Sequence, residues 1–493
     1  MNFFDYLFTE TKELPKKFIL GDSEELSFSE LYNNSVQLAY YIKNRIGENN
    51  QILLLSNNSI FFITSYLAVI KSGNVCVPIN PAIEAENYKY IEELTESKLV
   101  FISDKIRSNI TFNTEKIDES NLIQIIKNNE GVNIKEDLQE QVLFDENRLA
   151  EIIFTSGSTG KPKGVMLTHL NLRANTESIL SYLKLTLNDS VLLVLPLYYC
   201  YGLSVFHTHL KVGASLVFNN NFILLGTVID DLRKYRCTGF SGVPSHFQML
   251  LRKSQTFTKT HFPFLRYVTQ AGGNLHEAFI MEFVNAFPIV DFFVMYGQTE
   301  ATARLSYLSP KLLKSKIGSI GNAILGVTLK VLDQDYNFLG VNKIGEIVAK
   351  GDNIMKGYFH DTQGTSEVLK NGWLHTGDLG YVDQDGFIFI TSRRKNIIKV
   401  RGNRISPREI EEVIVIDPEV VDCTVCGVEN DILGEAIKAM VVVNEYSNIP
   451  ELRNKLLKLC REKLSTYKIP QIFEFSVKLD VTTSGKKINS NSI

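Results

Sequence analysis

The sequence predicts an α/β protein with two parts. The first is a large N-terminal domain of parallel-type sheets with flanking helices plus a β-rich subdomain, and the second is a small mobile α+β C-terminal domain. Three observations support this. Apolar strands alternate with helical segments up to residue 295, short strands and glycine turns fill 330–390, and the basic run 393–402 precedes a compact unit that starts near Ile405. We place the domains at 1–394 and 395–493, with a hinge near Lys395.

The predicted elements follow this order. The first third contains an amphipathic helix at 29–45, a strand at 51–56, a helix at 60–72 and a strand at 75–79, which Pro78 and Pro81 close. The charged, Asn-rich stretch 106–146 is interpreted as a variable connection. Further strands are expected at 190–195, 215–218, 238–243, 267–271 and 291–295. Several end where polar or glycine motifs begin, and ligands bind beyond the carboxyl ends of strands in such sheets, so these motifs are expected to share one site.

Composition excludes several classes of protein. With 52 basic and 55 acidic residues the net charge is −3, which argues against a nucleic-acid partner. The N-terminus lacks the features of a secretory signal, so we expect a cytoplasmic protein. The longest apolar run, 60–70, is too short for a membrane span. Cys423 and Cys426 form the only close cysteine pair, but they lie in an apolar run without further ligands and are interpreted as core residues.

The segment Thr155–Gly164 is expected to bind phosphate. It reads Thr-Ser-Gly-Ser-Thr-Gly-Lys-Pro-Lys-Gly and follows the apolar stretch 150–154. Glycines let backbone N–H groups turn toward an anion, hydroxyls add donors, and a lysine supplies charge. It is not a Walker loop, because the glycines lie too close together and no hydroxyl residue follows Lys161. A nucleotide triphosphate is the expected ligand, and a plain polar surface loop is the alternative.

This loop resembles the phosphate-binding motif of the adenylate-forming superfamily, which includes acyl- and aryl-CoA synthetases, adenylation domains of peptide synthetases and beetle luciferase. Further motifs of the superfamily occur in the same order at 296–300, 372–380 and 482–487, and the resemblance spans Leu26 to Lys487. One departure is that Asp480-Val481 replaces a proline-basic pair before the last motif. The resemblance implies ATP and Mg²⁺ as cofactors.

The resemblance also implies roles for nucleotide-binding residues. Tyr296 would stack on adenine, Thr299 would donate to the α-phosphate, and Asp378 would bind the ribose hydroxyls beside Arg393. Thr155 and Glu300 would hold Mg²⁺, and Lys486 would bridge the substrate carboxylate and the α-phosphate, so that Lys486, Thr299 and Glu300 form the catalytic set. The full nucleotide-binding set is Thr155, Ser156, Gly157, Ser158, Thr159, Gly160, Lys163, Gly272, Gly273, Asn274, Tyr296, Gly297, Gln298, Thr299, Asp378, Arg393 and Lys486.

Acid and thiol sites are assigned by the same resemblance. The expected acyl pocket is Tyr199, Val243, His246, Ala271 and Gly272. Tyr199 stands where many acyl-CoA synthetases have a histidine, and the stretch 204–209 lacks an aspartate that would bind an amino group. Lys395 falls at the hinge position, and Gly402 in a loop that lines the pantetheine tunnel.

The expected function is an ATP-dependent carboxylate ligase. A small carboxylic acid would attack the α-phosphate to give acyl-AMP and pyrophosphate, and the thiol of CoA would then displace AMP. Loading onto the phosphopantetheine of an acyl carrier protein is the alternative. A luciferase-like oxidoreductase and a silent nucleotide-binding protein are more remote hypotheses.

Overall fold

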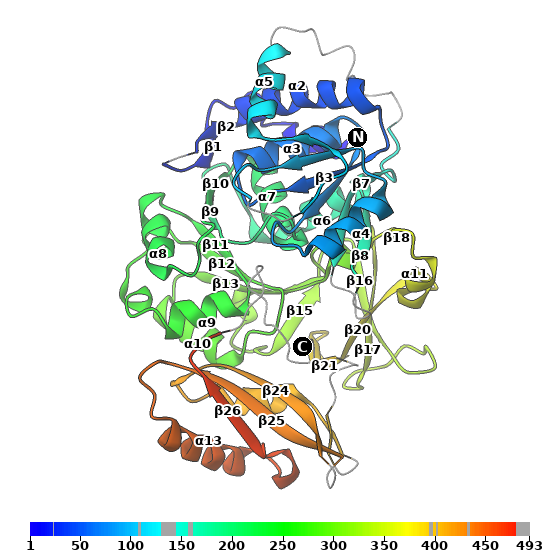
Figure 1. Cartoon of the computed structure of the whole chain (residues 1–493). Coiled ribbons are helices and arrows are strands. Elements are labelled where there is room, and N and C mark those ends of the chain that lie inside the picture. Colours follow the sequence, from blue (N-terminus) through cyan, green and yellow to red (C-terminus); the bar gives the residue numbers. More distant parts are fainter. Residues whose placement is uncertain are drawn as a thin grey trace.

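The structure is a computed structural model that describes residues 1–22, 24–106, 110–129, 144–155, 161–393, 398–400, 403–430 and 434–479. Its strands form three sheets with helices packed on and between them (Figure 1). The expected α/β class, the β-rich part and the small C-terminal domain are confirmed. In the part of the chain described, no helix is long and apolar enough to cross a membrane.

One sheet belongs to the N-terminal third and carries the strands around the phosphate loop. β3, β4, β5, β6 and β7 pair in parallel, whereas β8 and β18 are antiparallel. The order is β18 (Gly357–Tyr358), β8 (Lys163–Thr168), β7 (Leu149–Thr155), β4 (Val75–Ile79), β3 (Gln51–Leu55), β5 (Leu99–Ile102) and β6 (Glu115–Ile117). Helices from the same third are α2 (Phe28–Ile46), α3 (Ile60–Lys71), α4 (Ala85–Thr95) and α5 (Glu119–Asn128).

One expectation for this region is confirmed and one is wrong. The strand 75–79 has the predicted bounds, with Pro78 one residue before its end. The strand tolerates Pro78 because β4 pairs with β7 at Cys76, before the proline nitrogen that has no hydrogen to donate. The stretch 106–146 is more than a connection, because it contains β6 and α5. Asp118 caps α5 by accepting from the Asn121 N–H at 2.8 Å, a local signal that the charged composition obscured.

The longest sheet has a parallel half, in which β1, β10, β9, β11, β12 and β13 are neighbours, and an antiparallel half. Its strands are β1 (Lys17–Leu20), β2 (Leu26–Ser27), β9 (Ser190–Leu193), β10 (Ser215–Phe218), β11 (Gly239–Gly242), β12 (Tyr267–Gln270), β13 (Asp291–Tyr296), β14 (Ser306–Leu308), β15 (Ser319–Ala323), β16 (Val327–Leu332), β17 (Gly345–Gly351), β19 (Leu369–Lys370), β20 (Trp373–Val382) and β21 (Ile388–Arg393). The antiparallel half is the β-rich part expected at 330–390.

Helices cover these strands and fill the space between the first two sheets. They are α1 (Phe3–Phe8), α6 (His169–Leu183), α7 (Cys200–Val212), α8 (Leu225–Lys234), α9 (Pro244–Arg252), α10 (Glu277–Ala286) and α11 (Thr362–Val368), with 3₁₀ turns η1 (Phe257–Lys259), η2 (Thr299–Ala301) and η3 (Pro310–Leu312); a further 3₁₀ turn, η4 (Thr466–Lys468), belongs to the C-terminal unit. The main core joins strand residues of both sheets to fully buried aromatic side chains of α3 and α7, such as Phe62 and Phe206. This shared core holds the two sheets together.

The C-terminal unit forms a third sheet, orange to red in Figure 1, next to α9 and α10. Its elements are β22 (Ile398–Val400), β23 (Asn403–Ile405), α12 (Pro407–Ile414), β24 (Val420–Asn430), β25 (Gly434–Val443), α13 (Ile449–Lys463) and β26 (Ile472–Ser476). Gln248 of α9 donates to Asp422 at 2.8 Å, and the Arg252 guanidinium donates to the Val420 carbonyl at 3.1 Å. The chain changes sheet between Arg393 and Ile398, and the boundary at residue 395 stays a prediction because it lies outside the described residues.

Candidate active site

Four parallel neighbours, β9, β11, β12 and β13, deliver the expected motifs to one edge of the long sheet. Their carboxyl ends lead into 195–199, 243–246, 271–274 and 297–300. The Ala271 N–H donates to the Gly242 carbonyl at 3.3 Å, which fixes the ends of β11 and β12 side by side. The sheet therefore gathers segments that lie more than 100 residues apart, as expected for an open α/β site.

The chain folds back sharply after β13. Gly297 is required there, because a Cβ at this position would lie 2.0 Å from the Ala303 carbonyl oxygen. The intervening residues Thr299 and Glu300 form part of η2, and the Gln298 carbonyl accepts from the Ala301 N–H at 3.0 Å. The motif that starts at Tyr296 is thus a compact turn at the strand end.

Asp378 gathers two of the predicted nucleotide-binding residues. Its side chain is buried at 3% exposure; Oδ2 accepts from the Tyr296 hydroxyl at 2.7 Å, and Oδ1 accepts from Arg393 Nε at 3.0 Å. Burial, and then the charge of Asp378, raise the pKa of Tyr296, so its hydroxyl stays a donor. Each carboxylate oxygen keeps a further lone pair, which suits two vicinal hydroxyls of a ribose.

A second cluster joins Glu300 to Lys163. The Tyr358 hydroxyl donates to Glu300 Oε1 at 2.8 Å, and the Lys163 ammonium lies 5.0 Å from the centre of the Tyr358 ring. Lys163 Nζ is also 3.0 Å from Asp361 Oδ2. Burial, and then the Glu300 charge, raise the pKa of Tyr358. The Tyr358 hydroxyl therefore keeps its proton and donates a hydrogen bond to Glu300. These side chains meet because β18 pairs with β8, with Tyr358 opposite Val165.

The phosphate loop connects an antiparallel pair of strands. Thr155 ends β7 and faces Lys163, the first residue of β8, in the strand register. A Walker loop instead leads from a strand into a helix, so the arrangement agrees with the sequence-based exclusion. The loop residues Ser156, Gly157, Ser158, Thr159 and Gly160 lie outside the described residues, as do Lys395, Gly402 and Lys486.

Glu300 fits a magnesium ligand. Within the described residues its Oε1 accepts one hydrogen bond and its Oε2 accepts none. Mg²⁺ prefers carboxylate and phosphate oxygens together with several waters, so one unengaged carboxylate oxygen suits it. Thr155, the other predicted ligand, lies at the opposite end of the cluster, where its hydroxyl is 3.5 Å from the Lys163 carbonyl.

The adenine and acyl sides differ in exposure. Gly272, Gly273 and Asn274 are exposed after β12, and the Gln270 side chain donates to the Gly273 carbonyl at 2.8 Å. Ala271 is buried. The Gln270 side chain thus fixes the exposed segment 272–274, whose outer face is accessible to a ligand.

The remaining predicted acyl residues surround the starts of α7 and α9. Val243 and His246 are buried, and the His246 ring lies 4.1 Å from that of Phe222. Burial lowers the pKa of His246 to about 3, so it is neutral at pH 7. Tyr199 precedes α7 and packs against Tyr198, with ring centres 4.8 Å apart. The wall is apolar and aromatic.

Sequence reasoning missed Tyr358, Asp361 and Arg304. The first two approach Glu300 and Lys163 only through the pairing of β18 with β8, which no local pattern announces. Arg304 did carry a signal, because it stands in the otherwise uncharged run 301–308 just after the motif. It is 3% exposed.

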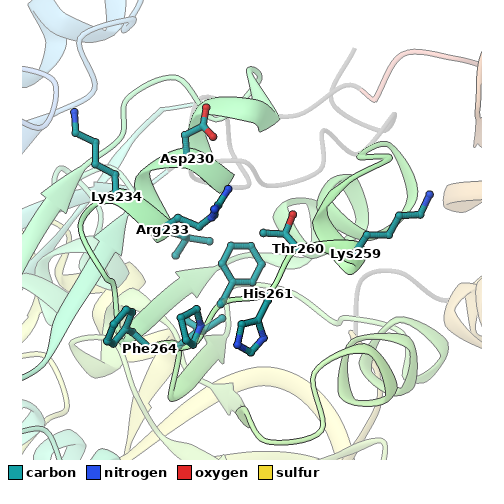
Figure 2. A pocket seen from close by; sticks show the side chains of 11 residues that line it. Asp230, Arg233, Lys234, Lys259, Thr260, His261 and Phe264 are labelled. Carbon is teal, nitrogen blue, oxygen red and sulfur yellow. The ribbon is translucent and has the colours of Figure 1, made fainter.

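A separate hollow lies on the other edge of the long sheet. Figure 2 shows Asp230, Arg233 and Lys234 of α8 along one side of it, and Lys259 and His261 on the other. The segment 259–265 precedes β12, so this hollow lies at the amino ends of the strands. It shares none of the residues described above.

Comparison with protein families gives the identity of the fold. The family model of the AMP-binding enzymes matches residues 7–359, and that of the AMP-binding enzyme C-terminal domain matches residues 409–486. The chain belongs to the AMP-binding enzymes. The resemblance inferred from the motifs is thereby confirmed, as is the class of acid–thiol ligase.

Individual relatives agree with this assignment. The 2-succinylbenzoate–CoA ligase of Bacillus pumilus is 34% identical over 344 residues, covering 70% of this chain and 68% of that protein. The oxalate–CoA ligase of Arabidopsis thaliana is 28% identical over 451 residues, covering 88% and 86%. Both relatives are named as CoA ligases.

Solved structures support the same family. The o-succinylbenzoate CoA synthetase of Bacillus subtilis with its acyl-adenylate intermediate has a TM-score of 0.84 at 26% identity, covering 99% of this chain and 96% of that one. The same enzyme with ATP and magnesium gives 0.82 at 26%, covering 99% and 98%. This AMP-binding enzyme therefore shares its whole fold with an enzyme that has been captured with an acyl-adenylate.

Proposed function

We propose that this AMP-binding enzyme joins a small carboxylic acid to CoA through an acyl-AMP intermediate. The observation that carries the proposal is the meeting of Tyr296, Asp378 and Arg393, because a buried carboxylate with free lone pairs supports a role in binding a nucleotide ribose. The CoA-ligase names of the relatives support CoA as the acceptor. If the enzyme instead transfers the acyl group to the phosphopantetheine of a carrier protein, that protein replaces CoA as the proposed acceptor.

In the first step a carboxylate oxygen of the acid attacks the α-phosphorus of ATP. The bond to the bridging oxygen breaks, and pyrophosphate leaves with its electron pair. The phosphate loop and Lys163 would hold the departing β- and γ-phosphates, while Thr299 and Lys486 would donate to the α-phosphate. Mg²⁺ held by Thr155 and Glu300 would neutralise charge on the phosphates. Asp378 would fix the ribose, and Tyr296 would stack on the adenine.

In the second step the thiolate of CoA attacks the acyl carbon of acyl-AMP, and AMP leaves as the thioester forms. We propose that the C-terminal unit rotates about Lys395 between the steps and brings Gly402 to the pantetheine arm. The change of sheet between Arg393 and Ile398 supports a hinge there.

The test is acid-dependent exchange of labelled pyrophosphate into ATP, followed by detection of acyl-CoA. Exchange and acyl-CoA formation with at least one acid would support the proposal. Exchange followed by transfer only to a holo carrier protein would replace CoA with that acceptor. Absence of exchange over aliphatic, aromatic, hydroxy and amino acids would overturn the proposed function.

Lys486 has its own test, since it lies outside the described residues. Lys486→Ala should reduce adenylate formation by at least 100-fold, because a single donor to a developing charge is worth roughly 3–4 kcal/mol, while thiolysis of supplied acyl-AMP continues. Lys487→Ala is the matched control, one residue away with the same charge. Equal loss of both half-reactions in the first variant, or a larger loss in the second, would contradict the assignment.

A further inference from the structure

Arg304 is a buried cation that no acidic side chain accompanies. It is 3% exposed, and no aspartate or glutamate of the described residues forms an ion pair with it. A buried charge is costly unless it is paired and fully hydrogen-bonded. By contrast, the Arg266 guanidinium binds both oxygens of Asp189 at 3.0 Å. Arg304 therefore differs from an ordinary structural arginine.

The neighbours of the Arg304 guanidinium are neutral, and its hydrogen bonds are long. Nη1 donates to the Ala303 carbonyl at 3.3 Å and Nη2 to the Ser204 hydroxyl at 3.4 Å, while Nε has no partner. The group also lies 4.5 Å from the centre of the Tyr201 ring. The Tyr182 hydroxyl interacts with the guanidinium as well. Among its five N–H donors, the one on Nε is left without a partner.

Glu151 is a buried carboxyl group that lines the same small internal gap as Ser204, but it forms no ion pair with Arg304. Its Oε2 accepts from the Tyr66 hydroxyl at 2.7 Å. Burial raises its pKa to about 7, and the hydrogen bond from Tyr66 opposes that rise. Among the described residues, no carboxylate forms an ion pair with Arg304.

The position of Arg304 relates it to the reaction centre. Its Cα would lie 2.8 Å from a Cβ on Gly297, so it directly underlies the 296–300 motif. On α7, Cys200 Sγ is 3.6 Å from Thr299 Oγ1, and Ser204, which meets the guanidinium, follows one turn later. Four helical residues span about 6 Å, so the guanidinium lies about that much deeper along α7 than Thr299.

We propose that Arg304 binds a second carboxylate of the substrate, so that the acid this enzyme activates is a short dicarboxylic acid. One carboxylate reacts with ATP near Thr299, and the other reaches the guanidinium. Its unpartnered Nε and an Nη atom, whose hydrogen bond is long, suit a carboxylate in a bidentate pair. A spacer of a few carbon atoms matches the depth of about 6 Å along α7. This inference rests on the proposed adenylation of a carboxylic acid and names the substrate class for it.

The first experiment uses the wild-type enzyme and pairs of acids matched in length. Pyrophosphate exchange is measured with succinate against butyrate, glutarate against pentanoate, and adipate against hexanoate. We expect kcat/KM for at least one diacid to exceed that of its monoacid partner by 10-fold or more. Exchange with monoacids but without any preference for a diacid would overturn the role of Arg304 and leave the proposed function standing.

Absence of exchange with these six acids and with the aromatic, hydroxy and amino acids named above would overturn the proposed function itself. Calorimetric titration of the three diacids, in the presence of a non-hydrolysable ATP analogue, then decides the binding role separately. Diacid binding that Arg304→Gln abolishes supports the inference, and no diacid binding overturns it.

The second experiment compares Arg304→Gln and Arg304→Lys with Arg266→Gln, which removes an arginine that has its own carboxylate partner. Loss of a charge-assisted pair should raise KM for the preferred diacid by roughly 10- to 100-fold in Arg304→Gln. KM for the matched monoacid should stay within about threefold, and Arg304→Lys should recover part of the diacid preference. A purely structural Arg304 would instead lower the melting temperature and leave the diacid-to-monoacid ratio unchanged, as expected for Arg266→Gln. If Arg304→Gln does not fold, the wild-type ratio and Arg304→Lys still decide the question.

Discussion

The proposed nucleotide side and the proposed acyl side of the site differ in how their charged groups are paired. On the nucleotide side, the carboxylates of Asp378, Glu300 and Asp361 each engage a donor from another element. On the proposed acyl side, His246 is neutral and packed against an aromatic ring, and within the described residues Arg304 has no ion-pair partner. The charged groups of the nucleotide side are paired before any ligand binds. The acyl side has an arginine that a ligand carboxylate would pair with.

This difference teaches where catalytic power and selectivity reside. In the proposed function, preorganised donors and acceptors act on ATP, the substrate shared by all acids in the first step. The residues predicted to line the acyl pocket are mostly apolar. A single charged side chain beside them would therefore decide which acids bind. Substitutions on the nucleotide side should therefore lower the rate with all acids, and those on the acyl side should change the ranking of acids.

Asp378→Asn should have the largest effect. Asparagine has one carbonyl oxygen and no charge, so it cannot accept from Tyr296, Arg393 and two ribose hydroxyls together. Loss of charge-assisted hydrogen bonds predicts a decrease of about 100-fold or more in kcat/KM for ATP with every acid. Steady-state pyrophosphate exchange measures it. Asp383→Asn, which breaks a 2.6 Å ion pair with Lys316 near the same strand, is the control; equal losses in both variants would remove Asp378 from the site.

His246→Gln tests the neutral character of the acyl wall through stability. The folded pKa of His246 is about 3, against 6.5 for the free side chain. Below pH 6.5 the unfolded state therefore binds the extra proton, and this stability is lost as pH falls. Glutamine does not titrate and can still accept from the Val243 N–H. Between pH 7 and pH 5 the wild type should lose about 2 kcal/mol more than the variant.

Chemical denaturation at the two pH values measures this difference. The exposed His261 supplies the control His261→Gln. The interpretation of His246 as a neutral wall residue would be wrong if both variants showed the pH dependence of the wild type.

Tyr358→Phe should have a moderate effect on the nucleotide side. It removes the hydroxyl that donates to Glu300 but keeps the ring beside Lys163. A hydrogen bond to a charged group is worth about 1.5 kcal/mol, which predicts a decrease of about 10-fold in exchange and a higher requirement for Mg²⁺. Tyr235→Phe removes an equivalent hydroxyl that donates to Asp22 at the surface, and it should change neither quantity. An unchanged magnesium titration in Tyr358→Phe would separate Tyr358 from the metal.

Local sequence patterns predicted the fold, because strands and helices alternate along the chain. Three of the residues predicted to bind the nucleotide also lie together, while their role stays a prediction. The sequence predicts strand Val75–Ile79 at its observed bounds. Tyr296, Asp378 and Arg393 belong to motifs whose residue types indicate the chemistry proposed for them. Each motif directly follows or lies within a strand. β13 ends at Tyr296 in the parallel half of the sheet, and the antiparallel pairing of β20 with β21 places Asp378 opposite Arg393.

The contacts that organise the site could not be predicted in the same way. Tyr358 reaches Glu300 because a two-residue strand pairs with β8, and so short a strand has no periodicity to detect. The burial of Arg304 depends on packing by Tyr201 and Ser204 from α7, which lies 100 residues earlier. These contacts depend on tertiary structure. The sequence shows that Tyr358 and Arg304 are present but not which residues they contact.

Asp361→Asn should have the smallest effect, and its direction is informative. Asp361 binds the Lys163 ammonium at 3.0 Å, and the Gly364 N–H and Lys163 hold the pKa of its carboxyl below the usual value. Asparagine still caps α11 but releases the lysine. A partly exposed ion pair is worth at most about 1 kcal/mol, so KM for ATP should fall by about two- to fivefold if Lys163 grips the phosphates. Asp118→Asn, at the start of α5, changes a cap without a lysine partner and should leave KM unchanged. A rise in KM for ATP in Asp361→Asn would mean that the ion pair positions Lys163 for the nucleotide rather than competing with it.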